Sequence, residues 1–217
     1  MTISERKAWE LQQRRERIID MAEAVFLKAG YENTTLPAIA DAAGYNKRTL
    51  YLYFKDKEEI FLAVVFRCLT RLHAALKAVG DRTRPEGIDL RRLANAFFDF
   101  SVHDPGDVDL IMIFESRFFI YHGRQPPAES RTYLERCQQV SDDIAQMVTN
   151  AIAAGIAAGK ISNDLTPRQH MLLLWGQIFG VMKVLRMREK NFKAAFGIDR
   201  KALFDRFVAM VERALAP

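Results

Sequence analysis

The most unusual chemistry in the sequence lies in "GYNKRTLYLYFKDK", residues 44–57. This stretch holds four aromatic rings, four Lys or Arg residues and one acidic residue. Cationic side chains bind phosphate oxygens, and aromatic rings pack against sugars and bases. Neither a solvated surface nor a protein core commonly combines so many rings with so many cations. The stretch therefore suits a surface that meets a nucleic acid.

The residues around this stretch predict two short helices joined by a tight turn. Ala40, Gly44 and Leu50 stand at relative positions 1, 5 and 11. A small residue lets two helices approach closely, a glycine accepts the left-handed backbone of the turn, and an aliphatic residue fills the angle between the helices. This spacing indicates a helix-turn-helix.

Capping residues support the predicted boundaries. Thr35 precedes the segment 36–43 and Asn46 precedes the segment from Lys47 to about Phe54, and both residue types are favoured as N-caps. A long fourth helix is expected after Asp56, with Glu59 completing a capping box. Gly30 is expected to end the first helix.

The helical period also predicts which side chains of the second short helix face outward. Leu50 and Phe54 would pack inward against an apolar stripe of the first helix that includes Phe26. The side chains left at the surface or at its rim are Lys47, Arg48, Thr49, Tyr51, Leu52 and Tyr53. A helix of this kind fits the major groove of B-DNA, where cations and tyrosine hydroxyls can contact phosphates and base edges.

Residues 34–65, "TTLPAIADAAGYNKRTLYLYFKDKEEIFLAV", resemble the DNA-binding signature of the tetracycline-repressor (TetR) family of bacterial transcription regulators. The resemblance implies that Thr35, Tyr51 and Tyr53 contact the DNA backbone, and that Lys57 contacts a phosphate. It also implies that the start of the third helix faces the bases. The full set of expected DNA-binding residues is Thr35, Tyr45, Asn46, Lys47, Arg48, Thr49, Tyr51, Leu52, Tyr53 and Lys57.

Three of these positions depart from the usual family pattern. Arg48 replaces a small residue, Tyr53 replaces a common histidine, and Tyr45 replaces a smaller aliphatic residue. Arg48 could bind guanine through two hydrogen bonds, or it could clamp a phosphate. Arg14, Arg15 and Arg17 could add phosphate contacts or form a solvated helix end.

Apolar periodicity predicts helices along almost the whole chain and no convincing strand. We therefore expect an all-α protein of about nine helices. Residues 1–60 should form the helix-turn-helix DNA-binding domain, including the start of the fourth helix. Residues 61–217 should form a helical regulatory and dimerisation domain. Its later helices are expected at about 88–103, 105–120, 129–158, 167–190 and 199–215.

A homodimer is expected because one short recognition helix contacts too few base pairs to define a site in a genome. The family resemblance also implies a dimer. Segment 171–187 is apolar nearly all round, and Gly176 and Gly180 would permit close helix approach. The expected interface residues are Leu174, Ile178, Met182, Phe204, Phe207 and Val211. The alternative is that these side chains belong to a large monomer core.

The resemblance further implies a small-molecule pocket in the second domain, for a hydrophobic or cationic effector. Segment 97–121 is rich in Phe and Met and is interrupted by a few polar residues, which suits such a ligand. The expected pocket residues are Phe100, His103, Met112, Glu115, Phe118, Phe119, Met147, Trp175 and Phe179. Each also has an alternative role in the core, at a helix end or at the surface. Effector binding would act on DNA affinity through the fourth helix.

The charge balance gives only indirect support for a polyanionic partner. The net charge is +5, yet residues 1–60 contain ten Lys or Arg and ten Asp or Glu. DNA binding must therefore rest on the local arrangement of charges. The excess of positive charge later in the chain leaves a second reading open, in which basic helices bind another protein or an acidic membrane surface.

Other classes of protein find little support in the sequence. No apolar segment is long enough for a membrane span, and the charged start lacks the pattern of a signal peptide, so we expect a cytoplasmic protein. Four histidines and two cysteines show no metal-ligand spacing. His103 and Asp104 form an "HD" pair that is weak by itself, and no nucleophile elbow or P-loop is present. We expect no metal, no cofactor and no enzymatic activity.

Overall fold

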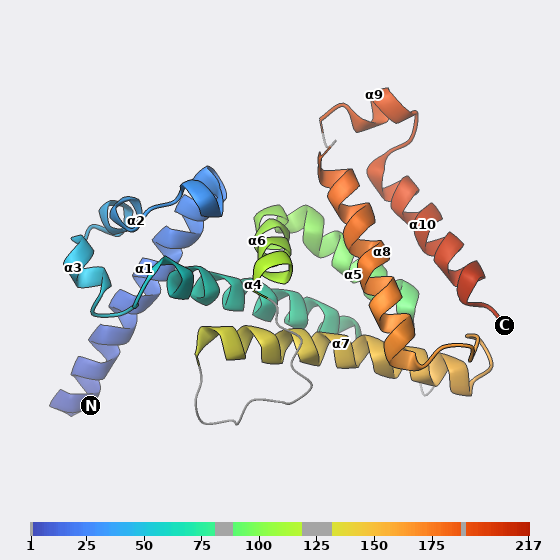
Figure 1. The fold of residues 1–217 in the computed structure, drawn as a ribbon, viewed down its shortest axis with the longest axis horizontal. Coiled ribbons are helices and arrows are strands. Elements are labelled where there is room, and N and C mark those ends of the chain that lie inside the picture. Colours follow the sequence, from blue (N-terminus) through green and yellow to red (C-terminus); the bar gives the residue numbers. More distant parts are fainter. Residues whose placement is uncertain (1, 81–88, 119–131, 188–189) are drawn as a thin grey trace. The chain divides into compact units, whose positions relative to one another are not determined.

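The structure is a computed structural model of the chain, and it describes residues 2–80, 89–118, 132–187 and 190–217. Ten helices and no strand occur in these ranges, which confirms the all-α prediction (Figure 1). Within the same ranges, each helix is too short or too polar to cross a membrane.

The helices follow the predicted ranges closely. They are α1 (Ile3–Asn33), α2 (Leu36–Ala43), α3 (Lys47–Leu50), α4 (Lys57–Gly80), α5 (Leu90–His103), α6 (Pro105–Arg117), α7 (Tyr133–Ala157), α8 (Pro167–Met187), α9 (Phe192–Phe196) and α10 (Arg200–Leu215). Residues 88, 119–120, 129–131 and 188–189, also predicted as helical, lie outside the described residues.

The chain forms two compact units. Unit 1 comprises residues 1–70 and 106–140, and unit 2 comprises residues 71–105 and 141–217. The helices α4 and α7 each contribute residues to both units. The proposed functional division into residues 1–60 and 61–217 remains a prediction, because compactness does not define which part binds DNA.

In unit 1, α2 packs against α1, and α3 packs against α2 (Figure 1). Leu50, Phe54 and Phe26, which are predicted to pack together, are all buried, and so are Ile39, Ala40 and Ala43 of α2. Burying one aliphatic side chain contributes about 1.5–3 kcal/mol to stability, so this small core fixes how α3 lies against α1.

Gly30 ends the regular part of α1, as predicted. Its backbone angles are φ 76° and ψ 163°, a conformation that essentially only glycine adopts. The hydroxyl of Thr34 donates a hydrogen bond of 2.7 Å to the Gly30 carbonyl. One further helical turn, up to Asn33, follows this break.

The start of α4 differs slightly from the predicted capping box. The Asp56 carboxylate accepts a hydrogen bond of 2.8 Å from the Glu59 backbone N–H, as expected. The Glu59 carboxylate, however, accepts its bond of 2.7 Å from the N–H of Lys55, one residue before the cap. Both bonds satisfy backbone N–H groups at the start of α4, and together they fix the segment that connects α3 to α4.

In unit 2, aromatic contacts join α5 to α8 and α10. The ring centres of Phe98 and Phe204 lie 4.7 Å apart, and those of Phe97 and Phe179 lie 6.2 Å apart. Trp175 lies 4.5 Å from Phe179 along α8. These distances are typical of favourable ring pairs in a protein core.

Helix α9 has no counterpart among the helices predicted from the sequence. This five-residue helix begins after Asn191 and ends at Gly197, and both of these residues have left-handed backbone angles. Five residues make little more than one turn, which is too short for apolar periodicity to register. Phe192 is buried and anchors this helix to unit 2.

Candidate nucleic-acid interface

The turn between α2 and α3 has the predicted geometry. Gly44 has φ 74° and ψ 31°, in the left-handed region, and its N–H donates to the Asp41 carbonyl at 3.1 Å. The Thr35 hydroxyl accepts from the Ala38 N–H at 3.3 Å, and the Asn46 side chain accepts from the Thr49 N–H at 2.8 Å. Caps on both helices and a glycine between them therefore fix the angle of the turn.

α3 is a single turn that continues into further turns up to Phe54. The N–H groups of Tyr53 and Phe54 both donate to the Leu50 carbonyl at 2.9 Å. The predicted helix up to about Phe54 is thus shorter, but its residues keep a helix-like path. The Tyr53 bond spans three residues, as in a 3₁₀ turn, and the Phe54 bond spans four, as in an α-helix. Leu50 and Phe54 are both buried.

The expected DNA-binding side chains of this segment lie at the surface. Lys47 and Arg48 are exposed, and Tyr51 and Leu52 are 50% and 77% exposed. The Lys47 ammonium lies 5.7 Å from the Tyr51 ring centre. Cations, a ring and an apolar side chain are therefore exposed together on this segment.

Other expected residues lie at the rim of this surface. Thr35 is exposed, whereas Tyr45, Thr49 and Tyr53 are half-buried. Asn46 is exposed and caps α3, and the Thr49 hydroxyl also donates to it at 3.0 Å. The structure therefore gives Asn46 a clear role in shaping α3, and its contact with DNA remains a prediction.

Lys57 has an internal role that the sequence analysis did not anticipate. Its ammonium donates to the Tyr31 carbonyl at 2.9 Å and to the Glu32 carbonyl at 3.4 Å. It also lies 4.5 Å from the Tyr31 ring centre. Lys57 thus ties the first turn of α4 to the end of α1, and its predicted phosphate contact remains untested.

Two arginines of α1 also have internal partners. Arg17 donates through Nε to the Ala43 carbonyl at 3.0 Å, at the end of α2. Arg15 donates through Nε to the Tyr133 hydroxyl at 3.3 Å, and its guanidinium lies 4.7 Å from the Phe54 ring centre. These contacts favour a structural role for both arginines, although Arg17, like Arg14, is exposed.

A second candidate site is a cavity of about 110 Å³ within unit 2. Helices α4, α5, α7, α8 and α10 surround it. The lining residues are Leu76, Leu90, Arg91, Leu93, Ala94, Phe97, Ile144, Ala145, Val148, Met171, Leu174, Trp175, Ile178, Phe207, Val208, Val211, Glu212 and Leu215. The lining is apolar apart from Arg91, Glu212 and the indole N–H of Trp175.

Of the eight expected pocket residues that the structure describes, only Trp175 lines this cavity. Phe100, His103, Met147 and Phe179 belong to unit 2 but not to the lining, although Phe179 contacts Trp175. Met112, Glu115 and Phe118 belong to unit 1. Phe119 lies outside the described residues. A role of these residues in ligand binding elsewhere remains a prediction.

The expected dimer residues lie on the inner side of α8 and α10. Met182 and Phe204 are buried, and the other four line the cavity: Leu174, Ile178, Phe207 and Val211. Another face of α8 is exposed, and it carries Leu172, Leu173, Gly176, Gly180 and Val184, called here the α8 outer face. Apart from the adjacent backbone of α8, a Cβ atom added at Gly176 or Gly180 would meet no atom of the described residues within 4 Å.

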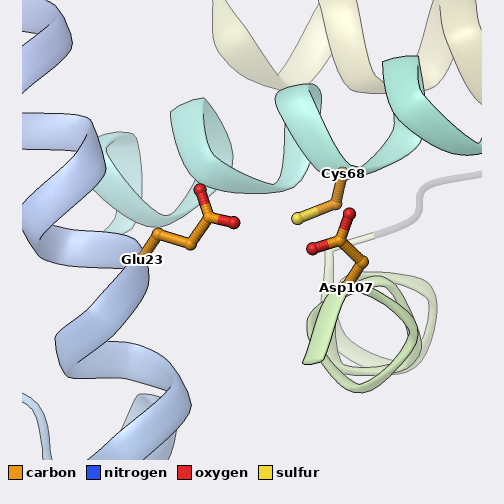
Figure 2. A group of neighbouring side chains, drawn as sticks. All are labelled: Glu23, Cys68 and Asp107. Carbon is orange, nitrogen blue, oxygen red and sulfur yellow. The ribbon is translucent and has the colours of Figure 1, made fainter. Parts of the chain in front are cut away.

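One group of metal-ligand residue types occurs in the described part of the chain (Figure 2). Glu23 of α1, Cys68 of α4 and Asp107 of α6 point toward one another, with ligand atoms within 4.8 Å. Each of the three already interacts with other groups of the protein. We therefore interpret the group as contacts that join three helices of unit 1.

Comparison with known proteins connects the α1–α3 arrangement to a family. The sequence pattern of bacterial regulatory proteins of the tetR family matches residues 18–64. The HTH-type transcriptional activator FasR of Mycolicibacterium smegmatis is 35% identical over 99 residues, which span 46% of this chain and 45% of FasR. The HTH-type transcriptional regulator SrpR of Pseudomonas putida is 28% identical over 201 residues, 90% of this chain and 87% of SrpR.

A solved structure of AibR, in complex with isovaleryl coenzyme A and operator DNA, has a similar fold. Its TM-score is 0.66 at 16% identity, over 91% of this chain and 97% of that chain. The matched residues 18–64 contain the turn at Gly44 and all of α3. Residues 18–64 of this chain therefore match the tetR family of bacterial regulatory proteins, and the chain has the fold seen in AibR.

Proposed function

We propose that the protein is a sequence-specific transcriptional regulator that binds a palindromic operator as a homodimer and acts as a ligand-responsive repressor. The observation that carries this proposal is the surface of α3. Leu50 and Phe54 anchor the segment in the core, while Lys47, Arg48 and Leu52 remain exposed. The match of residues 18–64 to the tetR family and the operator complex of the similar AibR structure support the same function.

In this proposal α3 enters the major groove of operator DNA. Lys47, Arg48 and Thr49, at its start, face the base edges. Thr35, Tyr51 and Tyr53 contact the phosphates and sugars on either side. Leu52 packs against an apolar group in the groove, such as a thymine methyl.

A homodimer would present two α3 segments about one or more DNA turns apart, which matches a palindromic site. We propose that the α8 outer face forms the dimer contact, because it exposes leucine and valine side chains beside two glycines. Glycines allow helix backbones to approach closely, and apolar side chains then bury surface against the partner.

We also propose that an effector occupies the cavity of unit 2 and lowers operator affinity. Leu76 of α4 lines the cavity, while the first turn of the same helix follows α3 in unit 1. A ligand that favours one position of α4 can therefore change the spacing of the two α3 segments. Coupling of this kind is typically worth about 1–3 kcal/mol.

The proposed activity is binding, without catalysis. The "HD" pair at His103 and Asp104 gives no reason for an enzyme, because His103 is exposed and its Nδ1 atom lies 2.7 Å from the Asp99 carbonyl of its own helix. Since the proposed partner is bacterial DNA, we expect the protein to act in the cytoplasm.

Selection of bound duplexes from a random pool tests the proposal most directly. The expected result is a palindromic consensus, since a symmetric dimer binds two equal half-sites. Lys47→Ala should then weaken binding to this consensus and lower the slope of log affinity against log salt by about one per half-site.

The matched control for Lys47→Ala is Lys193→Ala, which removes an exposed lysine from α9 of unit 2. It should change neither the affinity nor the salt slope. A pool without enrichment, or equal effects of the two substitutions, would favour a helical protein-interaction module over a DNA-binding regulator.

A further inference from the structure

The cavity of unit 2 has a lining with two distinct parts. Most of its surface comes from aliphatic and aromatic side chains, among them Phe97, Trp175 and Ile178. Among the residues that the structure describes, Arg91 of α5 and Glu212 of α10 are the only charged ones in this lining. The cavity therefore favours a ligand with an apolar body, because an uncompensated polar group buried there would cost several kcal/mol.

Arg91 and Glu212 form an ion pair with two parallel contacts. Arg91 Nε donates to Glu212 Oε1 at 2.7 Å, and Arg91 Nη2 contacts Glu212 Oε2. The side chains are 46% and 38% exposed, so the pair lies where the lining meets solvent. Water screens the pair on its exposed side, although its two parallel contacts give it a better geometry than most exposed ion pairs have.

The shape of the guanidinium decides which ligand group could replace a partner in this pair. A carboxylate can occupy the same two donors that Glu212 now uses, in the same planar geometry. Glu212 would then turn into solvent, where its charge is well hydrated. A ligand ammonium at Glu212 would lack this planar match, and a neutral ligand would leave the pair unchanged.

We propose that the cavity binds an apolar monocarboxylate, with its tail among Phe97, Trp175 and Ile178 and its carboxylate on Arg91 in place of Glu212. This inference rests on the proposed effector function and specifies the chemical class of the effector. The ligand would exchange one carboxylate for another at Arg91 and gain the burial of its tail, at about 25 cal/mol for each Å² of apolar surface.

Two substitutions test the proposal because they should act in opposite directions. Arg91→Gln removes the group that binds the ligand carboxylate, so decanoate should bind about tenfold or more weakly. Glu212→Gln removes the competing carboxylate, so decanoate should bind more tightly than to the unchanged protein. Isothermal titration calorimetry on the full-length protein measures both.

Decan-1-ol and decylamine serve as matched ligands with the same tail. Decanoate should bind the unchanged protein more tightly than either, and Arg91→Gln should abolish this preference without changing the affinity for decan-1-ol. Equal or weaker binding of decanoate, or effects of the same sign from the two substitutions, would overturn the proposal. Thermal melting of each variant confirms that it folds.

Measuring operator binding in the absence of ligand distinguishes a failure of the proposed effector class from a failure of the proposed regulator function. If the unchanged protein binds its selected duplex but does not prefer decanoate over the matched ligands, only the proposed effector class is contradicted. A protein that binds no duplex contradicts the regulator function, whatever the calorimetry shows.

Discussion

The Lys57 ammonium donates a hydrogen bond of 2.9 Å to the carbonyl of Tyr31 and lies 4.5 Å from the centre of the same residue's ring. This contact joins the first turn of α4 to the last turn of α1. The carbonyls at the end of a helix lack intrahelical partners, and a cation there also favours the helix dipole. Lys57 therefore holds together the helices that frame α3.

Replacing Lys57 should lower the stability of the protein and leave its electrostatic attraction to DNA unchanged. We expect Lys57→Met to reduce the free energy of unfolding by about 1–2 kcal/mol, because a charged hydrogen bond is lost. The salt dependence of operator binding should stay as in the unchanged protein. Urea denaturation and binding at several salt concentrations measure the two effects.

Lys55→Met is the control for this prediction, since the Lys55 side chain is 72% exposed and lies 4.0 Å from Asp56. It should leave stability almost unchanged. A lower salt slope for Lys57→Met at unchanged stability would instead support the phosphate contact that the family resemblance implies.

Gly44→Ala should destabilise the protein through its backbone alone. A Cβ atom at Gly44 would find only Arg17 Nη2, at an ordinary distance of 3.7 Å, so no steric clash arises. The left-handed backbone costs an L-residue about 1–2 kcal/mol. Gly44→Asn should lose less, because asparagine tolerates this conformation better. Denaturant unfolding measures this order, and equal stability of all three proteins would contradict it.

The helix-turn-helix could be predicted from the sequence because its determinants are local. Gly44 sets the turn, Thr35 and Asn46 cap its helices, and all three lie within twelve residues. Leu50 faces inward because the helical period places it there. The internal contacts of Lys57 could not be predicted in this way, since they join residues 26 positions apart.

The expected dimer residues illustrate the limit of periodicity. The stripe that includes Leu174 and Ile178 was identified as apolar, but an apolar stripe does not specify what covers it. In the structure these residues line the cavity, and Met182 is buried. The residues that line the cavity are even harder to predict from the sequence, because a cavity depends on how five helices pack and not on any one segment.

Leu52 should contribute to DNA binding but not to stability. Its side chain is 77% exposed, so Leu52→Ala removes little buried surface and should change stability by less than about 0.5 kcal/mol. Operator affinity should fall by about 1 kcal/mol for each half-site through the lost apolar contact. Val102→Ala, at an exposed position of α5, should change neither quantity. Unchanged operator affinity in Leu52→Ala would remove Leu52 from the interface.

Gly180→Glu should dissociate the dimer without unfolding the subunit. The position is open on the α8 outer face, and glutamate is a better helix former than glycine. An unpaired charge buried against a partner costs about 3 kcal/mol or more, so sedimentation should show monomers. Gln146→Glu, an exposed position of α7, adds the same charge and should leave the dimer intact. Dimers in both variants would contradict this face as the interface.

The buried thiol of Cys137 predicts how stability depends on alkaline pH. Its Sγ donates to the Leu62 carbonyl at 3.3 Å, and the side chain is inaccessible to solvent. Burial raises the pKa of the Cys137 thiol far above its ordinary value of 9.0, and Glu115 raises this pKa further, against the opposing effect of Arg136. The folded protein therefore keeps this thiol protonated where the unfolded chain loses the proton.

At alkaline pH the unfolded chain binds fewer protons than the folded protein does. The contribution of the Cys137 thiol to the free energy of unfolding should therefore be fully present below about pH 9, and above it the free energy of unfolding should fall by up to about 1.4 kcal/mol per pH unit. Urea unfolding of the unchanged protein and of Cys137→Ala over this range isolates the contribution. The variant should start less stable, because a buried group is lost, and show a shallower decline. Equal slopes would mean that the unfolding reaction does not release the Cys137 proton, which would contradict the raised pKa.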